Sequence, residues 1–313
     1  QEDYTFDTLG SYDVGTVNAV SGVTTEFGNI NLDTDGTITV GEVVESLTGS
    51  VDITANGAGA VVNVGANVSG DDVTIEAIDA AGNSALNVTA ATENAVGSTT
   101  LNADDGTLDI DANVTAHESL LLQADTNILL AGNLLADDSI TVEDGLEVDA
   151  SSTITADDGD VSFGSTVSAA AAAIDLAVNA GDTVTFGGNV ADNAGANTVL
   201  NDLTVNAATL HTDTNIITVG NDLLLGGTNA VEIDGEASVF TAANDIVFNA
   251  NGTLDAAAGT ETLQVVATAG DAVLGTIGNA VPLVDLDVDV AAGIGIINNN
   301  ITVAGAIDFA GSA

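Results

Sequence analysis

Short segments of alternating apolar and polar residues recur along most of the chain. Examples are VDITANG (51–57), GTLDIDAN (106–113), DDSITVEDG (137–145) and NDIVFNANG (244–252), each of which runs into Gly, Asn or Asp. Alternation over a few residues, closed by turn-forming residues, is typical of a strand with one buried face. The segments start roughly every ten to thirteen residues between Val51 and Phe309, a spacing typical of all-β folds. We therefore predict an all-β protein.

Two segments are the only candidates for helix. GEVVESL (41–47) and VSAAAAAIDLAV (167–178) lack strict alternation, and the second contains a run of alanines. Alanine has the highest intrinsic helix propensity, so these segments could form short helices. Both are too short to change the predicted fold class.

The spacing of aspartate pairs predicts stacked units. Pairs begin at Asp71, Asp104 and Asp137, at equal intervals along the chain, and a fourth begins after a shorter interval at Asp157. A regular spacing of this kind indicates a repeat architecture, here with uneven units. Two architectures fit: a parallel β-helix (β-solenoid) of short strands, or tandem β-sandwich domains. The short strands and an aromatic content of 3% favour the solenoid.

Asparagine at the predicted turns supports the same architecture. Asn tolerates left-handed backbone conformations and can form side-chain ladders between stacked coils. The candidates for such ladders are Asn201, Asn215, Asn221, Asn244 and Asn251. We assign residues 1–22 to an N-terminal strand segment, either a donor strand or a cap, and residues 23–313 to a repetitive β-solenoid.

The second half of the chain resembles a known class of surface proteins. The segments GDTVTFGGNVADNAGANTVLNDLTVNAATLHTDTNIITVGNDLLLGG (181–227) and VLGTIGNAVPLVDLDVDVAAGIGIINNNITVAGAIDFAG (273–311) carry a glycine-paced strand pattern. This pattern is similar to the degenerate repeats of filamentous-haemagglutinin-type adhesins and large autotransporter passengers. The resemblance, mainly over residues 150–313, implies a right-handed parallel β-helix and a role in surface adhesion or matrix building. The chain departs from that family in having no basic residue and an acidic, Tyr-bearing N-terminal segment.

The charge of the chain restricts its partners. It has 47 acidic residues and no Lys or Arg, giving a net charge of -47. Nucleic acid and anionic lipid require a basic surface, so we exclude both as partners, and cations, cationic partners and neutral glycans remain. No apolar run approaches the roughly 18 residues of a membrane span, so we expect no membrane insertion. The lack of Met, Cys, Trp and tryptic sites suits an extracellular or cell-surface location.

One loop has the oxygen spacing of a calcium site. In NLDTDGTITVGE (31–42), the side chains of Asn31, Asp33, Asp35 and Glu42 could surround Ca²⁺, with Gly36 making the bend. The spacing resembles the calcium loops of EF-hand and dockerin proteins. In the alternative interpretation, residues 30–32 and 38–40 are strands joined by an ordinary hairpin turn. We favour the turn, with a bound cation as a candidate.

The aspartate pairs are a second set of candidate ligands. Adjacent carboxylates repel one another, and stacking them from coil to coil raises the demand for a cation such as Ca²⁺. In the alternative interpretation they are solvated turn residues. The candidate ligands are Asp71, Asp72, Asp104, Asp105, Asp137, Asp138, Asp157 and Asp158.

Nothing in the sequence predicts an enzyme. The only imidazoles, His117 and His211, lie in TAHESLL and TLHTDTN without a candidate nucleophile, and we interpret both as surface or turn residues. The polysaccharide-cleaving solenoid hydrolases that the chain resembles carry Gly-His-Gly and Arg-x-Lys elements, and both are missing here. Asn-x-Ser/Thr motifs that could accept glycans occur at Asn67, Asn87, Asn113, Asn251 and Asn300.

The N-terminal segment predicts self-association. QEDYTFDTLGSYDV contains Tyr4, Phe6, Leu9 and Tyr12, which could complete a neighbouring subunit as a donated strand or cap the chain's own first coil. Solenoid ends that lack a cap stack head to tail. Our leading hypothesis is a self-assembling extracellular structural protein with a cation-binding acidic surface. The alternatives are a passenger segment of an adhesin that binds a glycan or host surface, and a surface protein whose acidity is an adaptation to salt.

Overall fold

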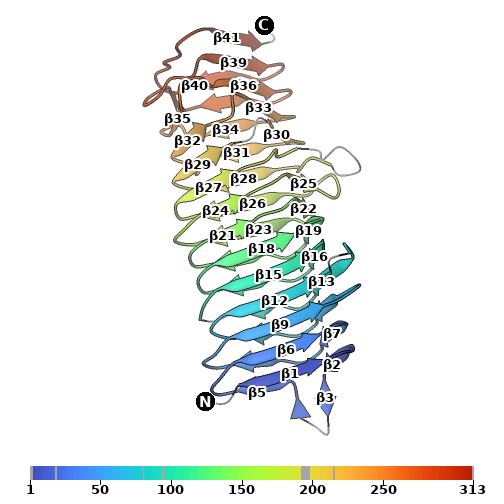
Figure 1. Cartoon of the computed structure of the whole chain (residues 1–313). Helices are drawn as coiled ribbons and strands as arrows, with labels where there is room; N and C mark the ends of the chain where they lie inside the picture. Colours follow the sequence, from blue (N-terminus) through green and yellow to red (C-terminus); the bar gives the residue numbers. More distant parts are fainter. Residues whose placement is uncertain are drawn as a thin grey trace. The chain divides into compact units, whose positions relative to one another are not determined.

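The chain folds into short parallel strands wound into successive coils (Figure 1). The computed structural model describes residues 3–17, 20–79, 81–93, 96–191, 198–213 and 216–311. It divides into an N-terminal unit, residues 1–146 with 155–157, and a C-terminal unit, residues 147–154 with 158–313. The described residues contain no helix, and both units are β-solenoids. The predicted all-β parallel solenoid is confirmed, and the tandem-sandwich alternative is wrong.

The coils of the N-terminal unit have three sides, and the strands on each side are parallel to one another. The first sheet contains β1 (Tyr4–Thr8), β6 (Ile30–Thr34), β9 (Val51–Asn56), β12 (Val73–Ile78), β15 (Thr99–Asp104), β18 (Leu120–Ala124) and β21 (Ile140–Val142). The second contains β2 (Tyr12–Val14), β7 (Thr37–Val40), β10 (Val61–Val64), β13 (Ser84–Val88), β16 (Gly106–Ile110) and β19 (Asn127–Leu130). On the third side lie β5 (Val23–Thr25), β8 (Val44–Ser46), β11 (Val68–Ser69), β14 (Thr92–Glu93), β17 (Val114–Ala116) and β20 (Leu134–Ala136). A short antiparallel pair, β3 (Thr16–Val17) and β4 (Val20–Ser21), interrupts the first coil. Along the chain, β22 (Leu146–Val148) and β23 (Ser152–Ala156) span the boundary between the units.

The C-terminal unit repeats the same three-sided order. Its first sheet contains β24 (Val161–Phe163), β27 (Thr183–Phe186), β29 (Thr209–Thr212), β32 (Ala230–Ile233), β35 (Thr253–Ala256) and β38 (Thr276–Ile277). The second side contains β25 (Val167–Ala169), β30 (Ile216–Val219), β33 (Ala237–Ala242), β36 (Thr262–Ala267), β39 (Asp285–Val290) and β41 (Ile307–Gly311). The third contains β26 (Leu176–Ala180), β28 (Leu203–Asn206), β31 (Leu223–Leu225), β34 (Ile246–Phe248), β37 (Ala272–Leu274) and β40 (Gly295–Ile297).

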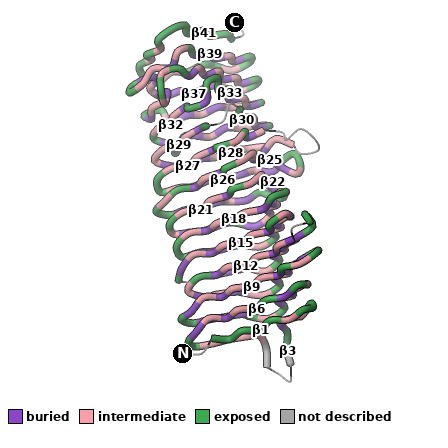
Figure 2. The backbone as a smooth tube through the Cα atoms, viewed as in Figure 1, coloured by how far each residue is buried: buried purple, intermediate pink, exposed green. Residues whose placement is uncertain are grey.

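Alternation along each strand produces the core. Side chains on a strand point to opposite faces in turn, so every second residue enters the interior. Figure 2 shows this as buried and intermediate residues alternating along the strands, with exposed residues at the corners. Because the strands are parallel and in register, like residues stack in columns; one column runs through Leu32, Ile53, Ile75, Leu101 and Leu122, each at most 1% exposed. Burying one such side chain contributes about 1.5–3 kcal/mol.

The coil length differs from the predicted repeat. Leu120 pairs with Ile140 of the next coil, and Val73 pairs with Thr99 of the next coil, so successive coils differ in length. Both steps are shorter than the interval from Asp71 to Asp104. The spacing of the aspartate pairs is therefore not a coil length, and this part of the prediction is wrong.

Both candidate helices are strands and turns. In residues 41–47, β8 pairs with β5 and buries Val44 and Ser46. In residues 167–178, β25 and β26 flank a turn in which Ala173 has a φ of 70°, outside the helical region. Pairing with the neighbouring coils outweighs the helix propensity of alanine, because it satisfies the backbone groups and buries alternate side chains together.

Aromatic stacking across coils gives a test of the core. Phe163 and Phe186 lie in register on consecutive coils, with ring centroids 5.0 Å apart and planes 10° from parallel. We predict that Phe186→Ala lowers the free energy of unfolding by about 3–5 kcal/mol, because it opens a cavity in a closed column. The outward-facing control Thr185→Ala changes it by less than about 1 kcal/mol. Urea denaturation followed by circular dichroism measures both; equal losses would contradict the assigned register.

Candidate assembly surfaces and cation sites

The first coil of the N-terminal unit exposes core side chains. Tyr4 and Phe6 on β1 are in register with Ile30 and Leu32 on β6, which are 0% and 1% exposed. Tyr4 and Phe6 belong to the same interior columns but are 44% and 41% exposed, because no described strand lies on their other side. The apolar interior of the solenoid therefore reaches the surface at this coil.

The N-terminal segment is part of the solenoid. β1 pairs with β6 and β2 pairs with β7 of the same chain, so residues 4–14 form a regular coil and not a strand extended toward a neighbour. Of the predicted assembly residues, Leu9 is 89% exposed in the corner after β1. Tyr12 packs edge-on against Phe6, with centroids 4.8 Å apart. Burial of the Tyr12 phenol, followed by the nearby charge of Asp33, raises its pKa.

The last coil of the C-terminal unit has the same property. Ile307 and Phe309 on β41 are in register with the buried Leu286 and Val288 of β39, yet are 44% and 50% exposed. A groove of about 440 Å³ lies beside them, lined in part by Ile294 of the preceding coil. Sequence analysis did not single out these residues, because the alternation of β41 resembles that of any interior strand.

The predicted calcium loop is a corner of the solenoid. Asn31 and Asp33 lie on β6, and Asp35 lies in the turn, but β7 intervenes before Glu42. Four extended residues span about 13 Å, so Glu42 lies at the far end of β7 and the four side chains do not surround one ion. The hairpin alternative is wrong: β6 and β7 belong to different sheets and pair with strands of neighbouring coils.

Gly36 is required for the approach to the preceding coil. A Cβ at this position would lie 2.8 Å from the Ser11 hydroxyl and 2.9 Å from its backbone nitrogen. Hydrogen bonds to the preceding coil hold the turn there: the Thr34 hydroxyl donates to the Gly10 carbonyl (2.6 Å), the Thr37 amide to the Ser11 hydroxyl (2.9 Å), and the Asp35 amide to the Thr8 carbonyl (3.4 Å). Coil stacking therefore explains the glycine that the calcium interpretation assigned to a metal loop.

The aspartate pairs are distributed over different corners. Three pairs, Asp71–Asp72, Asp137–Asp138 and Asp157–Asp158, lie in the corner before a strand of the first sheet, whereas Asp104 is the last residue of β15 and Asp105 separates β15 from β16. Their partners differ as well. Asp137 lies 2.5 Å from Nδ1 of His117, and Asp72 accepts a hydrogen bond from the Ser98 amide (3.0 Å). Within the described residues, no three of these carboxylates converge on one point.

An Asn–Asp ladder joins the coils of the C-terminal unit. The amide nitrogen of Asn221 donates to the Asp202 carboxylate (2.8 Å), and Asn244 repeats the contact to Asp222 (2.8 Å). Each carboxylate also accepts the backbone N–H of the next aspartate, as in Asp222 N to Asp202 (2.9 Å). Asn201 donates likewise to Asp175 (2.8 Å), so the predicted ladder is confirmed at Asn201, Asn221 and Asn244. Asn251 is not part of it, and Asn215 lies outside the described residues.

Two buried carboxylates are held by backbone amides. Asp79, 4% exposed, accepts hydrogen bonds from the amides of Gly59 and Ala81, both at 2.8 Å, and these lower its pKa. Glu261 is 2% exposed. Burial opposes its ionisation, but its own amide and the amide and hydroxyl of Thr260 outweigh burial and lower its pKa. Backbone amides thus stabilise these two carboxylates in a chain that has no Lys or Arg to pair with them.

At Asp105 the environment acts in the opposite direction. Asp105 has a φ of 60°, and burial, a hydrogen bond with Asp125 and the charge of Asp104 raise its pKa. Asp52 shows the same direction, because burial and the nearby Asp72 raise its pKa. The surroundings of Asp52 and Asp105 thus oppose ionisation of their carboxyl groups.

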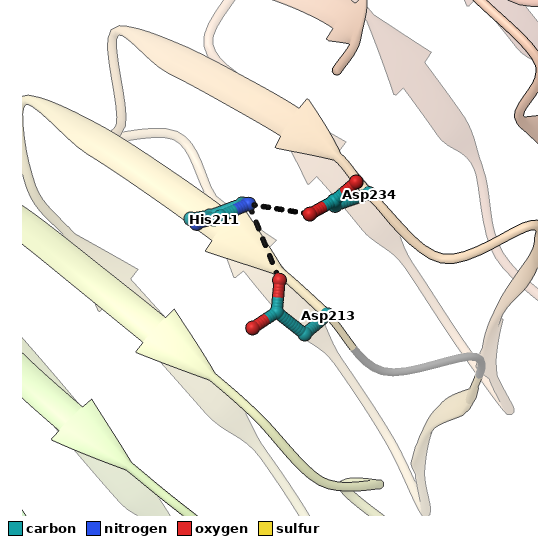
Figure 3. Close-up of side chains that lie close together, drawn as sticks. All are labelled: His211, Asp213 and Asp234. Atoms are coloured by element: carbon teal, nitrogen blue, oxygen red, sulfur yellow. Dashed lines mark ion pairs between the residues drawn. The ribbon is translucent and has the colours of Figure 1, made fainter. Parts of the chain in front are cut away.

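Only one group of potential metal ligands converges in the described part of the chain. His211, Asp213 and Asp234 each bring a donor atom within 4.8 Å of the others (Figure 3). The sequence interpretation of His211 as an ordinary surface residue missed this group. The available signal was the pair His211 and Asp213, which lie two residues apart and therefore on one strand face. Asp234 follows Asp213 at the same separation as Ala230 follows its paired residue Thr209.

Comparison of the chain with protein families, curated proteins and solved structures gives no match. The described part of the chain contains no helix with the length and hydrophobicity that a membrane crossing requires.

The opposite pKa shifts of Asp79 and Asp105 predict opposite effects of neutralising them. Asp79→Asn should lower the urea midpoint at pH 7, because the new amide group cannot accept both backbone hydrogen bonds. Asp105→Asn should raise it, because it removes a repelled charge and Asn tolerates positive φ. The contrary order of midpoints would contradict the assigned environments.

The pH dependence follows from the signs of the shifts. The lowered pKa of Asp79 stabilises the fold above the unfolded pKa, and this contribution is lost as the pH falls through the folded value, below 3.8. The raised pKa of Asp105 destabilises the fold above its folded value, and this contribution disappears below the unfolded value of about 3.9. As the pH is lowered, the stability gained through Asp105→Asn should therefore disappear first. The stability lost through Asp79→Asn should shrink only at lower pH.

The Asn–Asp ladder makes a separate prediction. Asn221→Ala removes the amide that bridges Asp202 and Asp222 (2.8 and 3.2 Å) and should cost about 1.5–3 kcal/mol of unfolding free energy. The exposed Asn251→Ala is the matched control, with a change within about 0.5 kcal/mol. Urea unfolding measures both; an unchanged Asn221→Ala would show that the ladder does not stabilise the coils.

Proposed function

We propose that this protein is a self-assembling extracellular structural subunit whose copies join head to tail through the outermost coils of its two units. The observation that carries the proposal is the exposure of core columns at both coils: Tyr4 and Phe6 on β1, Ile307 and Phe309 on β41. Exposed apolar side chains that form a contiguous surface commonly mark an interaction site. The fitting occupant is a second copy, because it presents the same three-sided coil.

The backbone supports the same partner. Among the described strands, β1 pairs only with β6 and β41 only with β39, so each has one edge with free hydrogen-bonding groups. A coil placed on such an edge continues the parallel ladder and covers the exposed column. The two surfaces differ, so the contact is heterologous, and a heterologous contact that does not close into a ring gives a filament.

Because the subunits are strongly negative, their assembly would involve cations. Each subunit carries a charge of -47 and no Lys or Arg, so joining two copies brings like charges together. Asp7 on β1 is in register with Asp33, and Asp308 on β41 with Asp287, so carboxylates lie on both outermost coils. Divalent cations, Ca²⁺ above all in an extracellular setting, would reduce this repulsion through shared oxygen ligands. We propose Ca²⁺ as a counterion shared at the contact, with no dedicated loop.

Assembly is tested by removing one apolar surface. In the presence of Ca²⁺, the full chain should form filaments visible by negative-stain electron microscopy, and EDTA should disperse them. Phe309→Asp should abolish the filaments while leaving the circular dichroism spectrum unchanged. The matched control is Leu135→Asp, which places the same charge at a 36% exposed outward position of β20 and should still form filaments.

The contradicting results are equally direct. If sedimentation velocity shows a single monomeric species at every protein concentration, both with and without Ca²⁺, the proposal is overturned. If Phe309→Asp and Leu135→Asp weaken the filaments to the same extent, association depends on net charge and not on the exposed columns.

A further inference from the structure

We propose that His211, Asp213 and Asp234 form a binding site for a transition-metal ion, with Zn²⁺ as the fitting ion (Figure 3). The site lies within the C-terminal unit, on the outward face of the first sheet. It is independent of the assembly surfaces described above.

The solenoid brings the three ligands together. His211 lies on β29 and Asp213 directly follows it, so the two side chains, two residues apart, share one face. Asp234 directly follows β32, and because Thr212 is in register with Ile233, the two aspartates occupy equivalent corners of consecutive coils. Backbone hydrogen bonds fix both corners: Asp213 N donates to Phe186 O (3.0 Å) and Asp234 N to Thr212 O (3.1 Å).

The distances suit a shared ion better than a direct ion pair. Nε2 of His211 lies 3.3 Å from an Asp213 oxygen and 3.6 Å from an Asp234 oxygen. A charge-assisted hydrogen bond would be about 2.7–2.9 Å. Ligands bound about 2.0–2.2 Å from a tetrahedral ion lie roughly 3.3–3.6 Å from one another, as the His211 contacts do.

The imidazole nitrogen provides an observation independent of the carboxylates. Nε2 of His211 is buried from solvent and makes no hydrogen bond in the structure. Buried polar atoms normally have a partner, so this atom is suited to an additional ligand. Its lone pair, directed between two carboxylates, provides the nitrogen donor that a zinc site requires.

The donor set selects the type of metal. Imidazole nitrogen suits Zn²⁺ and related transition ions, whereas Ca²⁺ and Mg²⁺ take oxygen ligands only. Three protein ligands leave a fourth position for water, which the partial exposure of the group allows. The other histidine lacks this arrangement: His117 is 57% exposed and has one carboxylate partner, Asp137.

The surrounding charge favours a dication at this place. Glu232 on β32 is in register with His211, so a third carboxylate lies on the adjacent strand. The chain has no Lys or Arg to neutralise these acids. A bound Zn²⁺ would hold two consecutive coils together through their corners and offset the repulsion between Asp213 and Asp234.

The experiment exploits the presence of only two histidines in the chain. Zn²⁺ is titrated into the full chain in excess Mg²⁺, which occupies sites made of oxygen ligands alone. Isothermal titration calorimetry should give one tight equivalent per chain, and the imidazole NMR signals of one histidine should shift. His211→Asn and Asp234→Asn should each abolish the tight equivalent, whereas the matched control His117→Asn should retain it.

Three results would overturn the proposal. One is a tight equivalent that persists in both His211→Asn and Asp234→Asn. The second is the absence of any tight equivalent in the unmodified chain, and the third is zinc-induced shifts of equal size at both histidines. Circular dichroism of each variant confirms that the fold is retained, which is expected because His211, Asp213 and Asp234 are all partly exposed.

Discussion

The structure depends on in-register parallel pairing between consecutive coils. Strands inside a sheet share their backbone hydrogen bonds with the coils before and after them, and this pairing also aligns the side chains. Leu is placed on Ile, Phe on Phe and Asn on Asp because the backbone register leaves no other arrangement. A slip of one residue would move every apolar side chain of a strand to the solvent face. The apolar columns, the Asn–Asp ladder and the His211 group all follow from this constraint.

The chain satisfies buried and crowded carboxylates without any Lys or Arg. It uses backbone amides for Asp79 and Glu261, and Asn amides for Asp202 and Asp222. The imidazole of His117 pairs with Asp137. These donors lie on neighbouring coils or turns at fixed positions, so they replace salt bridges only because the coils are stacked in register. Asp52 and Asp105 have no such compensation, because burial and neighbouring carboxylates raise the pKa of each.

Much of the fold could be predicted from local pattern, because alternation in segments such as VDITANG directly encodes one buried face. The ladder residues Asn201, Asn221 and Asn244 were also within reach, since Asn-Asp precedes a strand each time. Coil length was not, because Asp71, Asp104 and Asp137 have equal spacing, but Asp104 ends a strand of the first sheet whereas Asp71 and Asp137 lie in the corner before one. At the predicted calcium loop, the spacing from Asn31 to Glu42 suits a folded loop, but in the structure β7 extends this segment. His211 and Asp234 meet only through the coil register, which no single segment contains.

We propose that stacked side chains and backbone ladders join one subunit to the next in the same way as they form the core. Amide hydrogen exchange of assembled against dispersed protein tests it most directly. The account predicts that assembly protects the amides of β1 and β41 and leaves interior strands such as β15 and β35 unchanged. Protection gained on outward corners of interior coils, with β1 and β41 exchanging as before, would contradict it.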